Sequence, residues 1–121
     1  MVEGANEVFD VVVVGAGPAG LSAALNARQN GLKYLLLEKA NHLADTIYCY
    51  QKGKFVMAEP TVIPLRGVLG FKADKRENLL AEWDAVARNL NVVYNAAVVA
   101  VRPRDSGDRA GNPLSNFFTI Q

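Results

Sequence analysis

The stretch VVVVGAGPAG, residues 11–20, constrains the fold of this chain more than any other. It predicts a short apolar strand, a tight turn and the first turn of a helix, and its glycines follow the order G-x-G-x-x-G. In such a loop the first glycine, here Gly15, permits the tight turn. The second, Gly17, lets backbone N–H groups approach a pyrophosphate, and the third, Gly20, lets the helix pack closely on the strand. The motif therefore predicts a dinucleotide-binding loop.

The sequence on both sides supports this interpretation. Phe9–Val14 is apolar apart from one aspartate, as expected of a strand covered on both faces of a parallel sheet. Pro18 stands where a helix tolerates proline, because its missing N–H would have no intrahelical partner. Leu21–Asn30 is rich in helix formers, and Gly31 is placed to end the helix. Tyr34–Leu37 then predicts a second buried strand.

An acidic residue, Glu38, lies at the end of that second strand, 23 positions after Gly15. This is close to the spacing of about 20 residues at which an acid binds the ribose hydroxyls. Lys39, directly after it, either contacts the ribose region or is solvated. A chance glycine turn in an ordinary βαβ unit is the alternative, but strand, loop, helix, strand and acid in register favour dinucleotide binding.

Composition limits the class of protein. With 121 residues, the chain is long enough for one modest domain, and half of it is hydrophobic. Its formal net charge of +1 and lack of a basic run argue against nucleic-acid binding. The uncharged run 11–27 is short, broken by glycine and proline and preceded by acids, which predicts neither a membrane span nor a signal peptide. We expect a cytoplasmic protein with a small-molecule cofactor, and leave homodimer formation open.

We divide the chain into a βαβ segment (9–39), a long loop (40–73), a segment of helix and strands (74–101), and a loop with a final strand (102–121). Inside the long loop we expect a helical turn near His42–Ile47 and short strands at Phe55–Met57 and Thr61–Pro64. Asp74 and Glu77 have the spacing of a capping box.

Behind the capping box, four apolar residues recur at helical spacing, which predicts an amphipathic helix: Leu79, Trp83, Val86 and Leu90. Trp83 is therefore expected in the core. Further strands are expected at Asn91–Tyr94, Ala97–Val101 and Phe117–Ile120. We expect the last of these to lack a partner, which would be a liability in a natural domain, so the chain is expected to be a piece of a longer protein.

The segment from Asp10 to Leu21 follows the pattern Asp-Val-x-Val-x-Gly-x-Gly-Pro-Ala-Gly-Leu. It resembles the N-terminus of the flavoproteins with two dinucleotide-binding domains, such as thioredoxin reductase, ferredoxin–NADP reductase-like enzymes and flavin monooxygenases. Leu37-Glu-Lys39, Asp45-Thr-Ile-Tyr48 and Tyr50 are most similar to the bacillithiol-disulfide-reductase-like branch.

The resemblance implies an α/β fold: a truncated, Rossmann-like FAD-binding βαβ unit with a parallel sheet and the start of a β-meander. FAD would be the bound dinucleotide, with Glu38 on its adenosine ribose, a backbone contact from Val98 to adenine, and the segment of Asp45 and Thr46 near the ribityl chain or flavin. NAD(P)H would bind a second domain that lies outside these residues. Five residues would cradle the pyrophosphate: Gly15, Gly17, Pro18, Ala19 and Gly20.

The chain also departs from these relatives. Some of them carry a cysteine where this chain has Ala19, and the chain has neither a C-x-x-C motif nor a second glycine motif. No side chain can be named as catalytic, and no metal site is expected. The leading hypothesis is the FAD-binding part of an oxidoreductase passing electrons from NAD(P)H through FAD to an acceptor, which a disulfide would fit. An NAD-binding dehydrogenase domain and a non-catalytic nucleotide or redox sensor are the alternatives.

The long loop holds residues whose roles stay open. Cys49, the single cysteine, is either a redox thiol or a partly buried small side chain. Apart from Asp45, no residue stands at metal-ligand spacing from His42. We expect His42 to hydrogen-bond the backbone after the second strand instead. Three aromatic residues either line a flavin face or form a small core of the loop: Tyr48, Tyr50 and Phe55.

Overall fold

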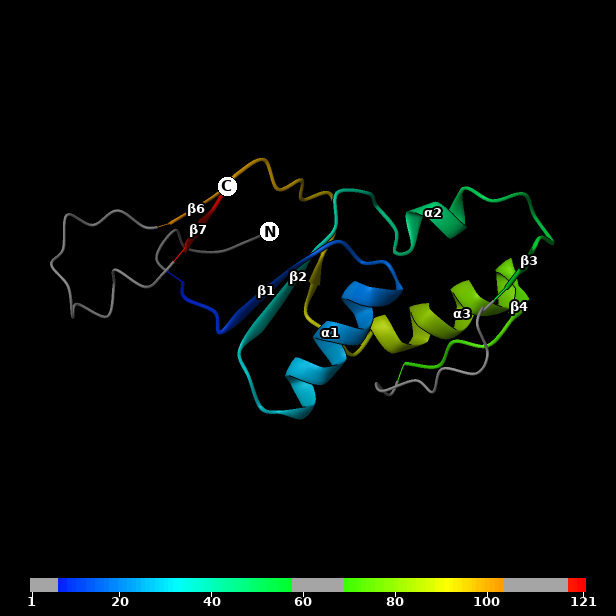
Figure 1. Cartoon of the computed structure of the whole chain (residues 1–121), viewed down its shortest axis with the longest axis horizontal. Coiled ribbons are helices and arrows are strands. Elements are labelled where there is room, and N and C mark those ends of the chain that lie inside the picture. The colour runs from blue at the N-terminus through cyan, green and yellow to red at the C-terminus, as the bar shows by residue number, and fades with distance from the viewer. Residues whose placement is uncertain (1–6, 58–68, 104–117) are drawn as a thin grey trace, which may run out of the picture.

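The computed structural model describes residues 7–57, 69–103 and 118–121 (Figure 1). A parallel sheet in the order β1–β2–β5 organises it, formed by β1 (Val11–Val14), β2 (Tyr34–Leu37) and β5 (Val92–Val93). Val11 pairs with Tyr34 at one end of β2, and Leu37 pairs with Val93 at the other. The expected α/β class with a parallel sheet is confirmed.

Helix α1 (Pro18–Gln29) connects β1 to β2 and packs against both. It ends in a Schellman motif: the N–H of Leu32 bonds the carbonyl of Ala27 at 3.0 Å, and that of Gly31 bonds the carbonyl of Arg28 at 3.1 Å. Gly31 has φ +68°, in the left-handed region that the motif requires. The expected βαβ unit and the role of Gly31 are both confirmed.

Helix α3 (Arg76–Ala87) supplies much of the core. Leu21 of α1, Leu36 of β2 and Trp83 of α3 belong to one buried cluster, so the two helices and the central strand share one core (Figure 1). Trp83 is fully buried, and its indole Nε1–H donates to the carbonyl of Gly70 at 2.9 Å. The expectation that Trp83 lies in the core is confirmed.

The start of α3 differs from the expected capping box. Asp74 belongs to β4 (Asp74–Lys75), which pairs antiparallel with β3 (Phe55–Val56), and the helix begins one residue after β4 with no side-chain cap. Glu77 accepts a hydrogen bond from the N–H of Gly53 at 2.8 Å instead of closing a box. The expected strand around Phe55 is confirmed, whereas the one at Thr61–Pro64 lies outside the described residues.

The C-terminal strands also correct the sequence-based assignment. β6 (Val101–Pro103) pairs antiparallel with β7 (Phe118–Ile120). The expectation of a strand over Ala97–Val101 is therefore wrong, because residues 96–100 are not part of a strand. The expectation that the final strand lacks a partner was wrong too, since its partner precedes it in the chain.

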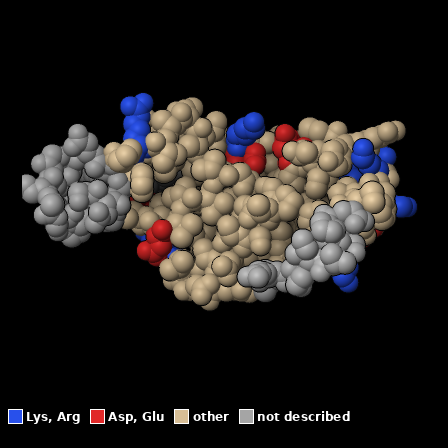
Figure 2. All heavy atoms as spheres, viewed as in Figure 1, with Lys and Arg blue, Asp and Glu red and all other residues tan. Residues whose placement is uncertain are grey.

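Burial of the sheet is uneven. Val14 at the end of β1 is 57% exposed, so the expectation of a strand covered on both faces is wrong for β1, whereas Leu35–Leu37 of β2 are buried. On the face shown in Figure 2, the described Lys and Arg side chains are interspersed with Asp and Glu and form no continuous stripe. Within the described ranges, no helix has the length and apolar character needed to cross a membrane.

Candidate functional site

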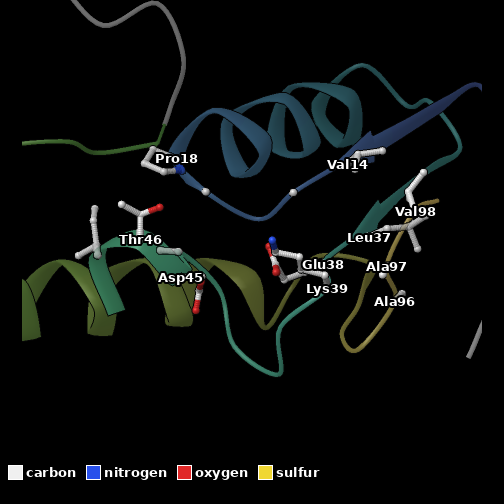
Figure 3. A pocket seen from close by; sticks show the side chains of 14 residues that line it. Val14, Pro18, Leu37, Glu38, Lys39, Asp45, Thr46, Ala96, Ala97 and Val98 are labelled. Carbon is white, nitrogen blue, oxygen red and sulfur yellow. The ribbon is translucent and has the colours of Figure 1, made fainter. Parts of the chain in front are cut away.

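A cavity of about 440 Å³ opens beyond the carboxyl ends of β1 and β2 (Figure 3). In parallel α/β sheets this is the position at which ligands bind. The glycine loop, the segment after β2 with the short helix α2 (Asp45–Tyr48), and the segment after β5 surround it. Its lining residues are Val14, Gly15, Gly17, Pro18, Leu37, Glu38, Lys39, Ala44, Asp45, Thr46, Ile47, Ala96, Ala97 and Val98.

The structure brings most of the expected site residues to this cavity. Seven of them line it: Gly15, Gly17, Pro18, Glu38, Lys39, Thr46 and Val98. Ala19 and Gly20 do not, because they lie in the first turn of α1 behind the loop. Ala44, Ala96 and Ala97 also line the cavity, and sequence reasoning did not single them out. Small apolar residues carry no chemical signal, and only the spatial arrangement identifies them.

Two glycines of the loop are required by the fold itself. Gly15 has φ +100°, a conformation that side chains rarely adopt. A Cβ added at Gly20 would overlap the carbonyl oxygen of Gly15 and lie 2.9 Å from its carbonyl carbon. Gly20 therefore allows α1 to approach the loop closely.

Gly17 differs from both of these glycines. It has φ −80° and ψ −176°, which any residue can adopt, and a Cβ added there would meet no atom within 4 Å. Neither backbone conformation nor packing requires glycine at this position. The open space beside it belongs to the cavity, so the glycine loop can accommodate a ligand group that contacts the backbone at Gly17.

The N-terminus of α1 also faces this loop. Gly17 is the N-cap, and the first helical bond runs from the N–H of Leu21 to its carbonyl at 2.9 Å. The N–H groups of Ala19 and Gly20 precede that bond, so they have no acceptor within the helix. Free N–H groups and the positive end of the helix dipole favour an anion here.

Glu38 joins the glycine loop to the segment after β2. Its side chain is 6% exposed, and Oε1 accepts a hydrogen bond from the N–H of Ala16 at 2.9 Å. Oε2 accepts a hydrogen bond from the N–H of Ala40 at 2.7 Å. A carboxylate offers about four acceptor positions. Each oxygen therefore keeps capacity for a hydroxyl group in the cavity.

Backbone hydrogen bonds connect the same three segments. The N–H of Ala44, a non-glycine residue at φ +51°, donates to the carbonyl of Ala16 at 2.8 Å. The N–H of Asn95 donates to the carbonyl of Ala40, and that of Ala96 to the carbonyl of Glu38, both at 2.9 Å. These bonds fix the walls of the cavity relative to one another.

Helix α2 forms the wall opposite the glycine loop, and it confirms the expected helical turn. In Figure 3 the side chain of Thr46 points toward Pro18, whereas the carboxylate of Asp45 points away from the glycine loop. That carboxylate contacts His42 Nε2 at 2.6 Å and accepts from the Cys49 thiol at 3.6 Å. The hydrogen bond from His42 is the main reason that the pKa of the Asp45 carboxyl lies below its usual value.

Several residues of the long loop do not line this cavity. His42 contacts the side chains of Asn41 and Asp45, so the expectation that it bonds the backbone was wrong. Cys49 is exposed, so the expectation of a partly buried side chain is wrong. Desolvation by its neighbours and the Asp45 carboxylate raise the pKa of its thiol, which opposes a reactive thiolate. The three aromatic residues Tyr48, Tyr50 and Phe55 all lie outside the cavity. In the described part of the chain, no three His, Cys, Asp or Glu side chains are placed to hold a metal ion.

A strand, a glycine loop that opens a helix, and an acid directly after the next strand form the arrangement typical of dinucleotide-binding α/β units. The chain belongs to the pyridine nucleotide-disulphide oxidoreductase family, whose profile matches residues 12–107. It is 54% identical over 43 residues to a digeranylgeranylglycerophospholipid reductase of Methanococcus vannielii, covering 36% of this chain and 11% of that protein. It is also 54% identical over 33 residues to the thioredoxin reductase of Ureaplasma parvum, covering 27% of this chain and 11% of that protein.

Solved structures share the fold over more of the chain. Bacillithiol disulfide reductase from Staphylococcus aureus superposes with a TM-score of 0.67 at 24% identity, over 92% of this chain and 32% of that one. OTEMO in complex with FAD and NADP superposes with a TM-score of 0.61 at 22% identity, over 81% of this chain and 21% of that one. The expected likeness to thioredoxin reductase and bacillithiol disulfide reductase is thus confirmed. The chain spans about a tenth of the curated relatives and at most a third of these structures.

Proposed function

We propose that this chain forms the FAD-binding part of a flavin-dependent oxidoreductase that passes electrons from NAD(P)H through FAD to an acceptor. A disulfide is the acceptor class that the family description favours. The nicotinamide cofactor would bind elsewhere in the complete protein. FAD would carry the redox chemistry, accepting a hydride and passing electrons on, and the protein would supply binding and orientation.

One observation carries the proposal: the open space beside Gly17 at the mouth of the cavity. The apo fold tolerates a side chain there, so the glycine is explained by a ligand that needs the backbone. The cavity volume of about 440 Å³ lies within the range of about 300–1,000 Å³ usual for small-molecule sites. OTEMO, a protein of the same fold, was solved with FAD bound.

Each site residue then has a physical role. Gly15, Gly17 and Pro18 would form the floor under the pyrophosphate, and the free N–H groups of Ala19 and Gly20 would face its oxygens. The remaining contacts would come from the walls of the cavity. Glu38 would accept from the adenosine ribose hydroxyls, with Lys39 beside it, while Val98 would contact adenine and Thr46 would approach the ribityl chain or flavin.

Glu38 also restricts the choice of dinucleotide. Its buried carboxylate would repel the 2′-phosphate of NADP, so the site suits FAD or NAD and disfavours NADP. The acid and the glycine loop would bind NAD as well as FAD. An NAD-binding dehydrogenase domain is therefore the alternative that binding experiments must separate from the proposal.

The test is a titration of the purified 121-residue chain with FAD, NADH and NADPH in parallel, followed by flavin or nicotinamide fluorescence. The proposal expects FAD to bind more tightly than NADH, and NADPH to bind most weakly. The variant Gly17→Val should lose FAD binding and keep its fold, because the new side chain fills the space beside the loop.

Two further results bear on the proposal. Tight NADH binding without FAD binding would support a dehydrogenase domain instead, and full FAD binding by Gly17→Val would refute the loop assignment. The chain lacks a second glycine motif, so we expect it to bind FAD without NADPH-dependent turnover. Tight FAD binding by the complete protein with no acceptor reduction would favour a sensor over an enzyme.

A further inference from the structure

Helix α2 is a single helical turn that provides the cavity with its wall opposite the glycine loop. Thr46 and Ile47 line the cavity from this turn, and Ile47 is the buried residue among its four. A helix this short gains little stability from its own hydrogen bonds. Neighbouring side chains must therefore contribute to its orientation.

His42 contacts both ends of α2. Its Nε2 lies 2.6 Å from Oδ1 of Asp45, the first residue of the helix. Its ring stacks on the ring of Tyr48, the last residue, with centroids 3.7 Å apart and planes at 18°. The other ring nitrogen, Nδ1, lies 2.6 Å from the side-chain oxygen of Asn41. These contacts lie on the side of α2 that faces away from the glycine loop.

Arg76, the first residue of α3, holds the C-terminal end of α2. Its Nη2 and Nε donate to the carbonyl of Tyr48 at 2.7 and 3.2 Å. The guanidinium also lies over the Tyr48 ring, 5.3 Å from its centroid. Nη1 donates to Glu77 at 2.7 Å, and the Arg76 side chain is only 13% exposed. Arg76 therefore links the end of α2 to the start of α3 through two charge-assisted hydrogen bonds.

We propose that His42 and Arg76 are positioning residues that orient α2 for the bound dinucleotide. The inference rests on the proposed function, because it concerns the same cavity. It assigns no catalytic role to either residue: neither lines the cavity, and each acts through α2.

Both nitrogens of the His42 ring have an oxygen partner, one on Asp45 and one on Asn41. The ring is thus held on both sides, and it also stacks on Tyr48. A glutamine at this position could keep one hydrogen bond to Asp45, whereas alanine would lose all of these contacts.

Other charged and titratable groups surround this contact. The direct partner, Asp45, is an anion, and its pKa is lowered first by the hydrogen bond from His42. A second cavity, of about 360 Å³, places Asp84 of α3 and Tyr94 near His42 as well. Asp84 is already paired with Arg88 at 3.0 Å. The groups that face His42 or Asp45 from the surrounding elements are Lys39, Cys49, Arg76, Asp84 and Tyr94.

The effect on binding follows from the population of oriented α2. If a variant reduces the fraction of molecules with α2 in the binding orientation, the apparent affinity for FAD falls by the same factor.

The experiment titrates the 121-residue chain with FAD at a single pH, following flavin fluorescence. His42→Ala should raise the dissociation constant about threefold, because the contacts to both ends of α2 are lost. His42→Gln keeps a neutral donor toward Asp45 and should recover part of the affinity.

Arg76 is tested at a fixed pH. Arg76→Ala should weaken FAD binding about tenfold, because two charge-assisted hydrogen bonds to α2 are lost. Arg76→Lys keeps the charge but not the two-pronged contact, so its affinity for FAD should lie between those of the wild type and Arg76→Ala. Arg28→Ala is the matched control, since Arg28 is an exposed arginine in the last turn of α1 and its variant should bind FAD as the wild type does. Fluorescence of the buried Trp83 confirms that each variant is folded.

The outcomes separate the two proposals. Absence of FAD binding by the folded wild-type chain would refute the proposed function, and this inference with it. FAD binding by His42→Ala with wild-type affinity would refute the role of His42 alone. Arg76 variants that bind FAD like Arg28→Ala would likewise refute the role of Arg76 and leave the proposed function intact.

Discussion

Two glycines of the same loop should respond in opposite ways to the same substitution. Gly20→Ala places a methyl group against the carbonyl of Gly15, where backbone must move to accept it. Gly17→Ala places a methyl group in open space, at a backbone conformation that alanine adopts freely. We therefore expect the first variant to lose stability, and the second to lose FAD affinity while keeping its stability.

The magnitudes follow from the structure. Overpacking a tight contact costs about 1–3 kcal/mol, and the overlap at Gly20 involves rigid backbone, so we expect a loss of about 3 kcal/mol in the free energy of unfolding. At Gly17, alanine restricts the unfolded chain and should raise the free energy of unfolding by up to about 1 kcal/mol. Its methyl group occupies the approach to the loop, and a tenfold weaker affinity would correspond to about 1.4 kcal/mol.

Urea unfolding measures the stability, with fluorescence of the single, fully buried tryptophan, Trp83, as the signal. A change of 1 kcal/mol should also move the melting temperature by roughly 4 °C in a domain of this size. FAD affinity is measured by titration at a temperature at which all variants are folded.

Any of three results would contradict the reasoning. If Gly17→Ala were as destabilised as Gly20→Ala, glycine at position 17 would serve the fold, and the open space there would have no bearing on ligands. If Gly17→Ala bound FAD with unchanged affinity, the cavity would not bring the pyrophosphate to this residue. A stable Gly20→Ala variant would show that helix α1 can move away from the loop at little cost.

Three further predictions concern acidic and thiol groups. Glu38→Gln should lower the free energy of unfolding by about 2 kcal/mol in urea titrations, because an amide has one oxygen for the two buried N–H groups that the carboxylate accepts. The pKa of Glu77 lies below 4.5, mainly through its hydrogen bond from Arg76, so its contribution to stability is complete above pH 4.5 and is lost on further acidification. Thermal melts of Glu77→Gln should accordingly fall less than those of the wild type between about pH 4.5 and pH 3. Desolvation and Asp45 raise the pKa of the Cys49 thiol, so it should react slowly with Ellman's reagent at neutral pH, and faster in Asp45→Asn.

The features that the sequence predicts correctly are those encoded locally. The order of glycines from Gly15 to Gly20 specifies a turn and a helix start within six residues, and Gly31 specifies the end of that helix. The position of Glu38 follows because it comes directly after the four-residue strand β2, at the carboxyl end of the sheet. Helical spacing of apolar residues likewise identifies α3 and its buried Trp83.

The features that sequence reasoning misses depend on contacts between distant segments. Asp74 has the residue type and spacing of a helix cap, yet it pairs with Val56 in a two-stranded ribbon, and the helix starts after it. The strand expected to begin at Ala97 forms later, at Val101, because its pairing partner begins at Phe118. Nothing in the local sequence near Ala97 specifies that partner.

The cavity wall shows the same limit. Ala44 adopts φ +51° without being glycine or asparagine, because its N–H bonds the carbonyl of Ala16 in the glycine loop. Its residue type gives no sign of this. Asn95, at φ +56°, does carry a signal, since asparagine tolerates the left-handed region better than most residues.

Glu38 connects the local and the long-range parts of this structure. Its two carboxylate oxygens bond the glycine loop and the segment after β2, and its own carbonyl accepts from the segment after β5. The residue that would recognise the ribose therefore also holds together the three segments that enclose it. A site held in this way needs little ordering when its ligand binds, and preorganisation of this kind increases affinity. A substitution at Glu38 should then impair stability and binding together, whereas one at Gly17 should impair binding alone, and this contrast separates the framework of the site from its contact surface.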